Sequence, residues 1–322
     1  MISGMPGYQK LVNVNGYQLT LDAPMSIFPQ QELKLKEYIQ GGPRNQVYEM
    51  GKKILKGNLS FPITIDSNGN IDPAVKEMIE CAQYPMRGLT IFTNYTLSQK
   101  YITADLRNWD SLGIPNNGFG IYNKITFEDC GITKMEISVQ ENQSATISAE
   151  VIGRIGTTTT PSQSLPAYGM MRRAVSYAEC DVYLTDPVYH WDTSKEFKLN
   201  IENNIEPIYT LYDGLTVADT NNWTDLPSII GMSTSHVNGH IKHSVDRGTA
   251  DSEKQSLPSG AWVGSDLIFD ISGVCEIKIP RMIANLTQQP IELGLLNRTT
   301  EFVALFRKTI LDTNEGHFIT FR

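Results

Sequence analysis

Most segments of this chain alternate apolar and polar residues with a period of two. Successive side chains of a β-strand point to opposite faces, so this alternation predicts strands that bury one face and leave the other in water. The segments that show it most clearly are residues 134–140, 144–151, 196–202, 267–272, 275–280 and 300–306. The sequence therefore predicts a mainly β protein.

A helical pattern is clear in residues 72–83. Asp72 can cap the helix N-terminus, and Pro73 suits the first helical position, where its lack of an N–H removes no hydrogen bond. Apolar residues recur at the spacing of a buried helical stripe, namely at Val75, Met78, Ile79 and Ala82. A weaker helical pattern covers residues 249–257.

The stretch GTTTTPSQSLPAYG, residues 156–169, replaces the apolar period with Thr, Ser and Pro. This composition is typical of a linker, so we expect one domain in residues 1–165 and another in residues 166–322. The order of strand and helix patterns in the first half recurs in the second, and this places Gly57 in line with Gly239. The sequence thus indicates an internal duplication.

Two segments are predicted as loops. Residues 98–120 lengthen the first half, are rich in Asn, Gly and aromatic residues, and have no sustained period, as is typical of exposed contact loops. Residues 202–207, ENNIEP, contain two carboxylates without the regular order of a calcium loop. We interpret them as an ordinary turn.

Composition narrows the function classes. The 322 residues include 35 acidic and 27 basic side chains, a formal net charge of −8, so the broad basic surface of a tight nucleic-acid binder is not expected. The four cysteines are widely separated and contain no CxxC pair, which favours reduced thiols. There is no apolar run of about 18 residues and no apolar segment near the start, so we expect neither a membrane span nor a signal peptide.

Three of the five histidines fall within HVNGHIKHSV, residues 236–245. The alternating apolar residues and the central glycine favour a strand over a helix. On a strand, His236 and His240 lie about 13 Å apart, too far to share one metal ion. We therefore predict no metal site but a polar strand face formed by His236, Asn238, His240 and Lys242.

Motifs of common enzyme classes do not occur: there is no GxSxG nucleophile elbow, no Walker-type phosphate loop and no HExxH zinc motif. Carboxylates such as Glu128, Asp129 and Glu136 are expected on a solvated strand face rather than in catalysis. We expect no enzymatic activity and no cofactor.

Three segments carry a resemblance to a known family. Residues 46–83 read as a strand, a polar turn and a helix. Residues 197–209 contain an NN-x-E strand, and residues 226–245 follow with a V-x-G-x-I strand. Their order resembles that of the tail tube proteins of tailed bacteriophages, in the longer form of this family. The resemblance covers roughly residues 18–306, but residues 24–43 depart from the family's acidic or tryptophan-rich opening, so the N-terminal arm has no assignment.

The resemblance implies two tandem tail-tube-like domains, each a β-sandwich or half-barrel with a flanking short helix. It implies a structural virion protein, the major tail tube subunit, found in the virion tail and in the host cytoplasm before assembly. Rings of sixfold or pseudo-sixfold symmetry would stack into a hollow tube through which phage DNA passes without specific binding. Three chains per ring are favoured over six, because three chains already supply six domains.

The expected partners follow from the same resemblance. They are further copies of the chain and the hub and terminator proteins of the tail, with sheath and tape-measure proteins as further candidates. No membrane partner is expected.

The resemblance also implies roles for two sets of residues. In the hairpin of residues 134–151, Glu136, Ser138 and Glu150 lie on the polar side of the alternation, and the resemblance places that side in the lumen. The alternative is the outer wall of the tube. An acidic lumen would withhold the cations that bind DNA phosphates. Candidate contacts between subunits or rings lie in the loop of residues 98–120, at Trp109, Asn116, Asn117 and Phe119.

Two alternative functions are kept. One retains the tube domains but places the protein at the tail tip, as a baseplate hub or distal tail protein that stops at one ring. The other, from a different class, is a carbohydrate-binding β-sandwich module. In that case, aromatic residues of segments 94–101 and 188–191 would stack on sugars.

Overall fold

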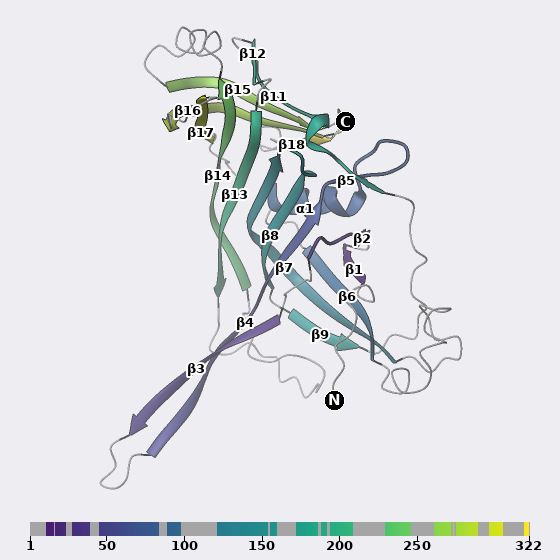
Figure 1. Ribbon diagram of the computed structural model, residues 1–322. Coiled ribbons are helices and arrows are strands. Elements are labelled where there is room, and N and C mark those ends of the chain that lie inside the picture. The colour runs from purple at the N-terminus through teal and green to yellow at the C-terminus, as the bar shows by residue number, and fades with distance from the viewer. Residues whose placement is uncertain are drawn as a thin grey trace.

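Figure 1 shows the fold of the chain in a computed structural model. The structure describes residues 11–15, 17–23, 28–38, 45–83, 89–97, 121–153, 155–159, 172–185, 188–191, 194–208, 229–245, 261–271, 273, 275–288, 296–304 and 319–321.

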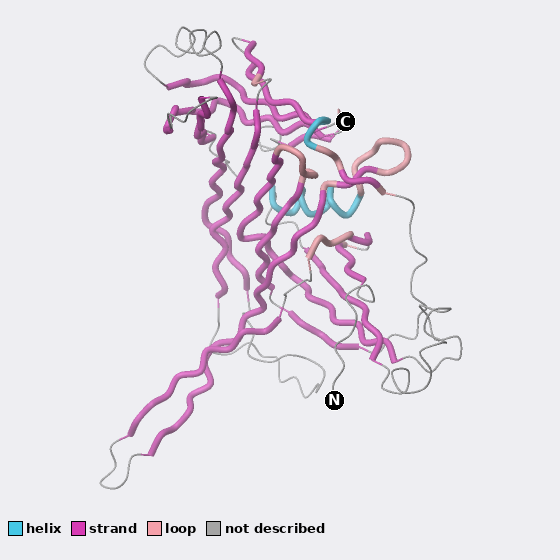
Figure 2. Tube along the Cα trace, in the orientation of Figure 1, coloured by secondary structure: helices cyan, strands magenta, loops and turns pink. Residues whose placement is uncertain are grey.

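Strands dominate both halves of the described chain, which confirms the predicted mainly β fold (Figure 2). The first half contains β1 (Leu11–Val14), β2 (Tyr17–Leu19), β3 (Phe28–Tyr38), β4 (Asn45–Pro62), β5 (Thr64–Ile65), α1 (Pro73–Gln83), β6 (Leu89–Leu97), β7 (Ile121–Gln140), β8 (Thr146–Gly153) and β9 (Ile155–Thr159). The second half contains β10 (Arg173–Ala174), the 3₁₀ helix η2 (Tyr177–Glu179), β11 (Cys180–Thr185), β12 (Val188–His190), β13 (Ser194–Ile208), β14 (Ile229–Val245), β15 (Ala261–Ile271), β16 (Cys275–Gln288), β17 (Leu296–Ala304) and β18 (Ile319–Phe321).

Antiparallel pairing joins strands of both halves into one sheet. Its main path runs β12–β11–β15–β16–β17–β14–β13–β7–β6–β1–β2, and β8, β4 and β3 continue from the other edge of β7. β7 and β13 pair from Lys134–Glu202 to Gln140–Glu196. The sheet therefore runs across the predicted domain boundary. The boundary itself, between residues 165 and 166, lies outside the described residues and stays a prediction.

Helix α1 begins where the sequence predicts. The Asp72 carboxylate accepts a hydrogen bond from the backbone N–H of Ala74 at 2.9 Å, as an N-cap does. Its other oxygen lies 2.6 Å from the Arg172 guanidinium. The predicted apolar stripe is buried at Val75, Met78, Ile79 and Ala82. The helix packs against β1, β2, β7 and β13, while the weaker helical pattern of residues 249–257 lies outside the described residues.

The apolar side of the strand alternation forms the core. Met135 and Ile137 of β7 and Leu199 of β13 are fully buried. In the second half, Phe197 of β13 stacks on Phe269 of β15 with ring centroids 3.9 Å apart. The same face of the sheet is therefore covered by α1 in the first half and by the β15–β16 layer in the second.

Two segments predicted as linker or turn contain strand. Residues 156–159 belong to β9, which pairs with β7 from Lys124–Thr159 to Glu128–Ile155, because β-branched threonine suits a strand. The turn predicted at residues 202–207 is wrong, because β13 continues through it. The register with β14 shifts between Asn203 and Ile205, where β14 has one residue more than β13. Burial along β13 itself alternates without a break through Glu206, so the segment stays a strand.

The N-terminal arm, which the sequence leaves unassigned, is a long hairpin. β3 pairs with β4 from Phe28–Lys56 to Tyr38–Asn45. This hairpin extends away from the rest of the molecule (Figure 1).

All four cysteines are free, and Cys81, Cys130 and Cys275 are buried, as predicted for core thiols, whereas Cys180 is only partly buried. Burial raises the pKa of the Cys275 thiol to about 12, so this thiol stays protonated at neutral pH.

In the described part of the chain, none of the helices has the length and apolar character needed to span a bilayer.

Candidate functional site

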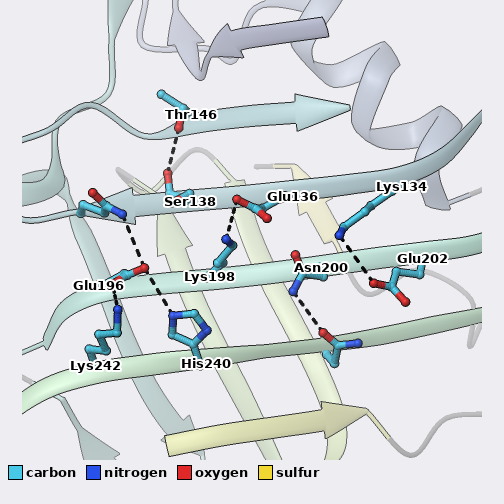
Figure 3. A network of polar contacts seen from close by, with 12 residues as sticks. Lys134, Glu136, Ser138, Thr146, Glu196, Lys198, Asn200, Glu202, His240 and Lys242 are labelled. Atoms are coloured by element: carbon cyan, nitrogen blue, oxygen red, sulfur yellow. Dashed lines mark hydrogen bonds and ion pairs between the residues drawn. The ribbon is translucent and has the colours of Figure 1, made fainter. Parts of the chain in front are cut away.

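One face of the central sheet is polar across both halves of the chain (Figure 3). Alternation brings every second residue of β8, β7, β13 and β14 to this side. This polar face comprises Thr146, Ser148 and Glu150 of β8, Lys134, Glu136, Ser138 and Gln140 of β7, Glu196, Lys198, Asn200 and Glu202 of β13, and His236, Asn238, His240 and Lys242 of β14.

Strand register arranges these side chains in rows across the sheet. The rows are Gln140–Glu196–Lys242, Thr146–Ser138–Lys198–His240, Ser148–Glu136–Asn200–Asn238 and Glu150–Lys134–Glu202–His236. Residues directly opposite one another on antiparallel strands have Cβ atoms about 5 Å apart. Neighbours in a row, and in adjacent rows, are therefore close enough to form contacts.

Each lysine of the polar face is paired with a glutamate. The N–O distances are 2.8 Å for Lys198–Glu136, 2.5 Å for Lys242–Glu196 and 3.9 Å for Lys134–Glu202. Four glutamates and three lysines give the face a formal charge of −1. The net charge of the chain is therefore not concentrated on these four strands, which carry matched charges.

Glu196 is the centre of the most connected cluster. Its carboxylate lies 2.5 Å from Lys242 Nζ and 3.3 Å from His240 Nε2, and it accepts a hydrogen bond from Gln140 Nε2 at 3.5 Å. Burial acts to raise the pKa of Glu196, but the hydrogen bonds and charges of Lys242 and His240 outweigh it and lower the pKa. Glu196 is therefore ionised at neutral pH.

Uncharged contacts connect the strands between the ion pairs. Asn200 Nδ2 donates to Asn238 Oδ1 at 3.1 Å, and the Thr146 hydroxyl donates to the Ser138 carbonyl at 3.5 Å. Figure 3 shows these contacts running from β8 to β14 without a break at the junction of the two halves.

The three predicted lumen residues all lie on the polar face. Glu150 is exposed, and Glu136 and Ser138 are partly exposed, so the alternation of the hairpin is confirmed. Glu136 is not an isolated carboxylate, because it pairs with Lys198. That this face lines a lumen stays a prediction. The predicted contact residues Trp109, Asn116, Asn117 and Phe119 lie outside the described residues.

The histidine segment is a strand, as predicted, because residues 236–245 lie within β14. His236 is exposed, His240 lies beside Glu196, and His243 is buried on the opposite face. Within the described ranges, no group of three or more His, Cys, Asp or Glu side chains could hold a metal ion.

In the segment 188–191, predicted as a sugar platform, Trp191 is 4% exposed and belongs to the core, so it is not available for stacking. This weakens the carbohydrate-binding alternative.

Sequence reasoning missed that β13 and β14 continue the polar face of β7 and β8. Alternation shows which side of a strand meets water, but not which strands are neighbours. The signal that was present is charge complementarity between distant strands: Glu196 and Lys198 of β13 face Lys242 of β14 and Glu136 of β7.

No family model matches the chain, and no curated protein is significantly similar to it.

Proposed function

We propose that this chain is a structural virion protein, the major tail tube subunit of a tailed bacteriophage, built from two tandem tube-like domains. Copies form rings that stack into a hollow tube, and phage DNA passes through it to the host. The proposal starts from the resemblance of residues 46–83, 197–209 and 226–245. The observation that carries it is the polar face, which continues across both halves with all of its lysines paired.

A conduit for DNA needs a wet surface that phosphate does not bind. Proteins bind phosphate with Lys and Arg side chains, whose contacts release counterions from the nucleic acid. On the polar face each ammonium lies 2.5–3.9 Å from a carboxylate. Because the charge of each lysine is offset by a neighbouring glutamate, phosphate gains little by contacting this face, and DNA slides along it without being held.

The partners of the proposed subunit are other copies of itself, three to a ring, and the hub and terminator proteins at the two ends of the tube. Sheath and tape-measure proteins are further candidates. The protein resides in the virion tail, after a period in the host cytoplasm before assembly. Catalysis, a cofactor and a membrane have no part in this function.

Negative-stain electron microscopy of the purified protein over a range of concentrations tests the proposal. Long hollow rods are the expected result, whereas rings that stop at one layer would favour the hub alternative. A chain that stays monomeric at high concentration in analytical ultracentrifugation, and that is absent from the tails of virions, would overturn the proposal.

A further inference from the structure

The two halves of the chain repeat one strand order. In the first half the neighbours run β2–β1–β6–β7–β8–β4–β3, and in the second they run β12–β11–β15–β16–β17–β14–β13. β9 pairs with the first part of β7, and β18 likewise pairs with the first part of β16. Eight strands of one half thus correspond to eight of the other in both chain order and sheet order.

The contact between the halves uses two strand edges of this repeat. The last part of β7 pairs with β13 over residues 134–140. In the repeat, β7 corresponds to β16, and β13 corresponds to β3. Each half therefore has two edges that could form this junction: β7 and β3 in the first half, β16 and β13 in the second. Within one chain, only β7 and β13 are joined.

The other two edges are open in the described part of the chain. β3 pairs there with β4 alone. β15 pairs with β16 as far as Asn285, opposite Ala261, and beyond it Leu286 and Gln288 pair with β17 on the opposite edge. Open edges of this kind are templates for pairing with another chain.

We infer that β3 of one chain pairs with the end of β16 of the next chain, repeating between copies the β7–β13 junction within each copy. This inference deepens the proposed ring assembly and rests on it. The contact joins two different surfaces of the chain, so it propagates head to tail and closes when a ring is complete.

The repeat fixes the register of this contact, beginning with β16. Gly57 pairs with Val151 of β8, and its counterpart Gly239 pairs with Phe302 of β17. Val151 and Phe302 are therefore equivalent positions in the repeat.

Ser148 lies three residues before Val151, and Thr299 lies three residues before Phe302. Ser148 pairs with Glu136 of β7, and Thr299 pairs with Gln288 of β16. Gln288 therefore takes the place of Glu136.

The same alignment of the two halves gives the counterparts of the β3 residues in β13. Lys56 pairs with Phe28, and its counterpart Asn238 pairs with Asn200. Phe28 therefore takes the place of Asn200, which is the residue opposite Glu136 in the junction. The predicted pair between chains is Phe28 with Gln288.

Cysteine cross-linking tests this pair. Opposed residues of antiparallel strands have Cα atoms about 4.5–5.5 Å apart, within the range of a disulfide. Phe28→Cys protein mixed with Gln288→Cys protein, assembled and then mildly oxidised, should give a band of two chains on a non-reducing gel. The double variant should give bands of two and three chains, and most of the protein should run in these bands rather than in the monomer band.

Three controls accompany the test. The equivalent pair within a chain, Glu136→Cys with Asn200→Cys, should cross-link but remain a monomer band. Val303 is 51% exposed on β17, and Val303→Cys mixed with Phe28→Cys should not cross-link. The unmodified chain shows whether its native cysteines contribute.

The outcomes separate the junction from the proposed function. Rings or tubes without the Phe28–Gln288 cross-link would overturn the junction and leave the tube function standing. Cross-linked closed oligomers that never stack and are absent from tails would support the junction and overturn the tube function. In the unmodified chain, amide hydrogen exchange at β3 and at the end of β16 should slow at least tenfold on assembly. Unchanged exchange in assembled rings would also overturn the junction.

Discussion

The side-chain amide of Asn203 donates a hydrogen bond to the backbone carbonyl of Ala82 at 2.9 Å, although 121 residues separate the two. The same nitrogen donates to the carbonyl of Ile132 at 3.0 Å. Ala82 lies in the last turn of α1, where backbone carbonyls have no partner within the helix. The buried Asn203 side chain of the second half is therefore hydrogen-bonded to both the helix and the sheet of the first half.

Replacing Asn203 with alanine should destabilise the whole chain. The change leaves two buried carbonyl oxygens without this donor, and the expected loss is about 2–4 kcal/mol in the free energy of unfolding. Urea denaturation of the unassembled protein measures it. Asn204→Ala is the matched control, because Asn204 is exposed, and surface substitutions cost about 0.5 kcal/mol or less. Equal losses in the two variants would contradict the role given to Asn203.

Strand and helix existence could be predicted from the sequence, because local patterns determine them. The cap at Asp72 and the buried stripe of α1 are within one segment, and so is the alternation around Glu136. Contacts between halves could not be predicted in this way. Asn203 reads as a turn residue when taken alone, since nothing near it in sequence shows that Ala82 needs a donor.

On the polar face, too, the local pattern of each strand could be predicted, whereas the contacts between strands could not. The water-facing side of each strand was predictable, but the pairing of Lys198 with Glu136 depends on the register between β13 and β7. Register is set by the burial of whole strands and by turn geometry. The long β3–β4 hairpin was missed because residues 28–38, FPQQELKLKEY, show no regular alternation of apolar residues over their length.

Gly239→Ala should be among the most damaging single changes in the chain. A Cβ at Gly239 would lie 2.0 Å from the Lys198 carbonyl oxygen and 2.6 Å from Phe302 Cζ. The backbone oxygen cannot rotate away, so β13 and β14 would have to separate, at a cost of about 3 kcal/mol or more. Thermal unfolding of the unassembled protein measures the loss.

Gly131→Ala is the control for this change. A Cβ there would lie 2.9 Å from Ile205 Cδ1, the end of a side chain that can change rotamer. The expected loss is about 1 kcal/mol. A Gly131 variant as unstable as the Gly239 variant would show that glycine itself, rather than the close approach of β13 to β14, sets the cost.

Glu196→Gln should destabilise the protein in a pH-dependent manner. The pKa of Glu196 is lowered from its ordinary value of 4.5, so its ion pairs with Lys242 and His240 contribute stability that is complete above that value. This contribution is lost as pH falls through the lowered pKa. The expected deficit of the variant is about 1 kcal/mol at pH 6, and it should shrink as the pH falls below 4.5 and through the lowered pKa of Glu196. Urea denaturation at pH 6 and at a series of lower pH values checks it, and a deficit that does not change with pH would contradict the ion-pair account.

The last prediction concerns passage of DNA and rests on the proposed function. Glu136→Lys would remove the partner of Lys198 and place a second ammonium beside it, creating a pair of cations that phosphate can reach. Virions with this change should form tails but eject DNA several-fold more slowly at low salt. The difference should shrink at physiological salt, where the Debye length falls from about 30 Å to about 8 Å. Asp266→Lys is the matched control: Asp266 pairs with Lys278 at 2.8 Å and is 26% exposed, against 2.8 Å and 27% for Glu136, but it lies on β15, outside the polar face. Slowing by both variants would show that net charge alone is responsible, and slowing by neither would remove the polar face from the path of DNA.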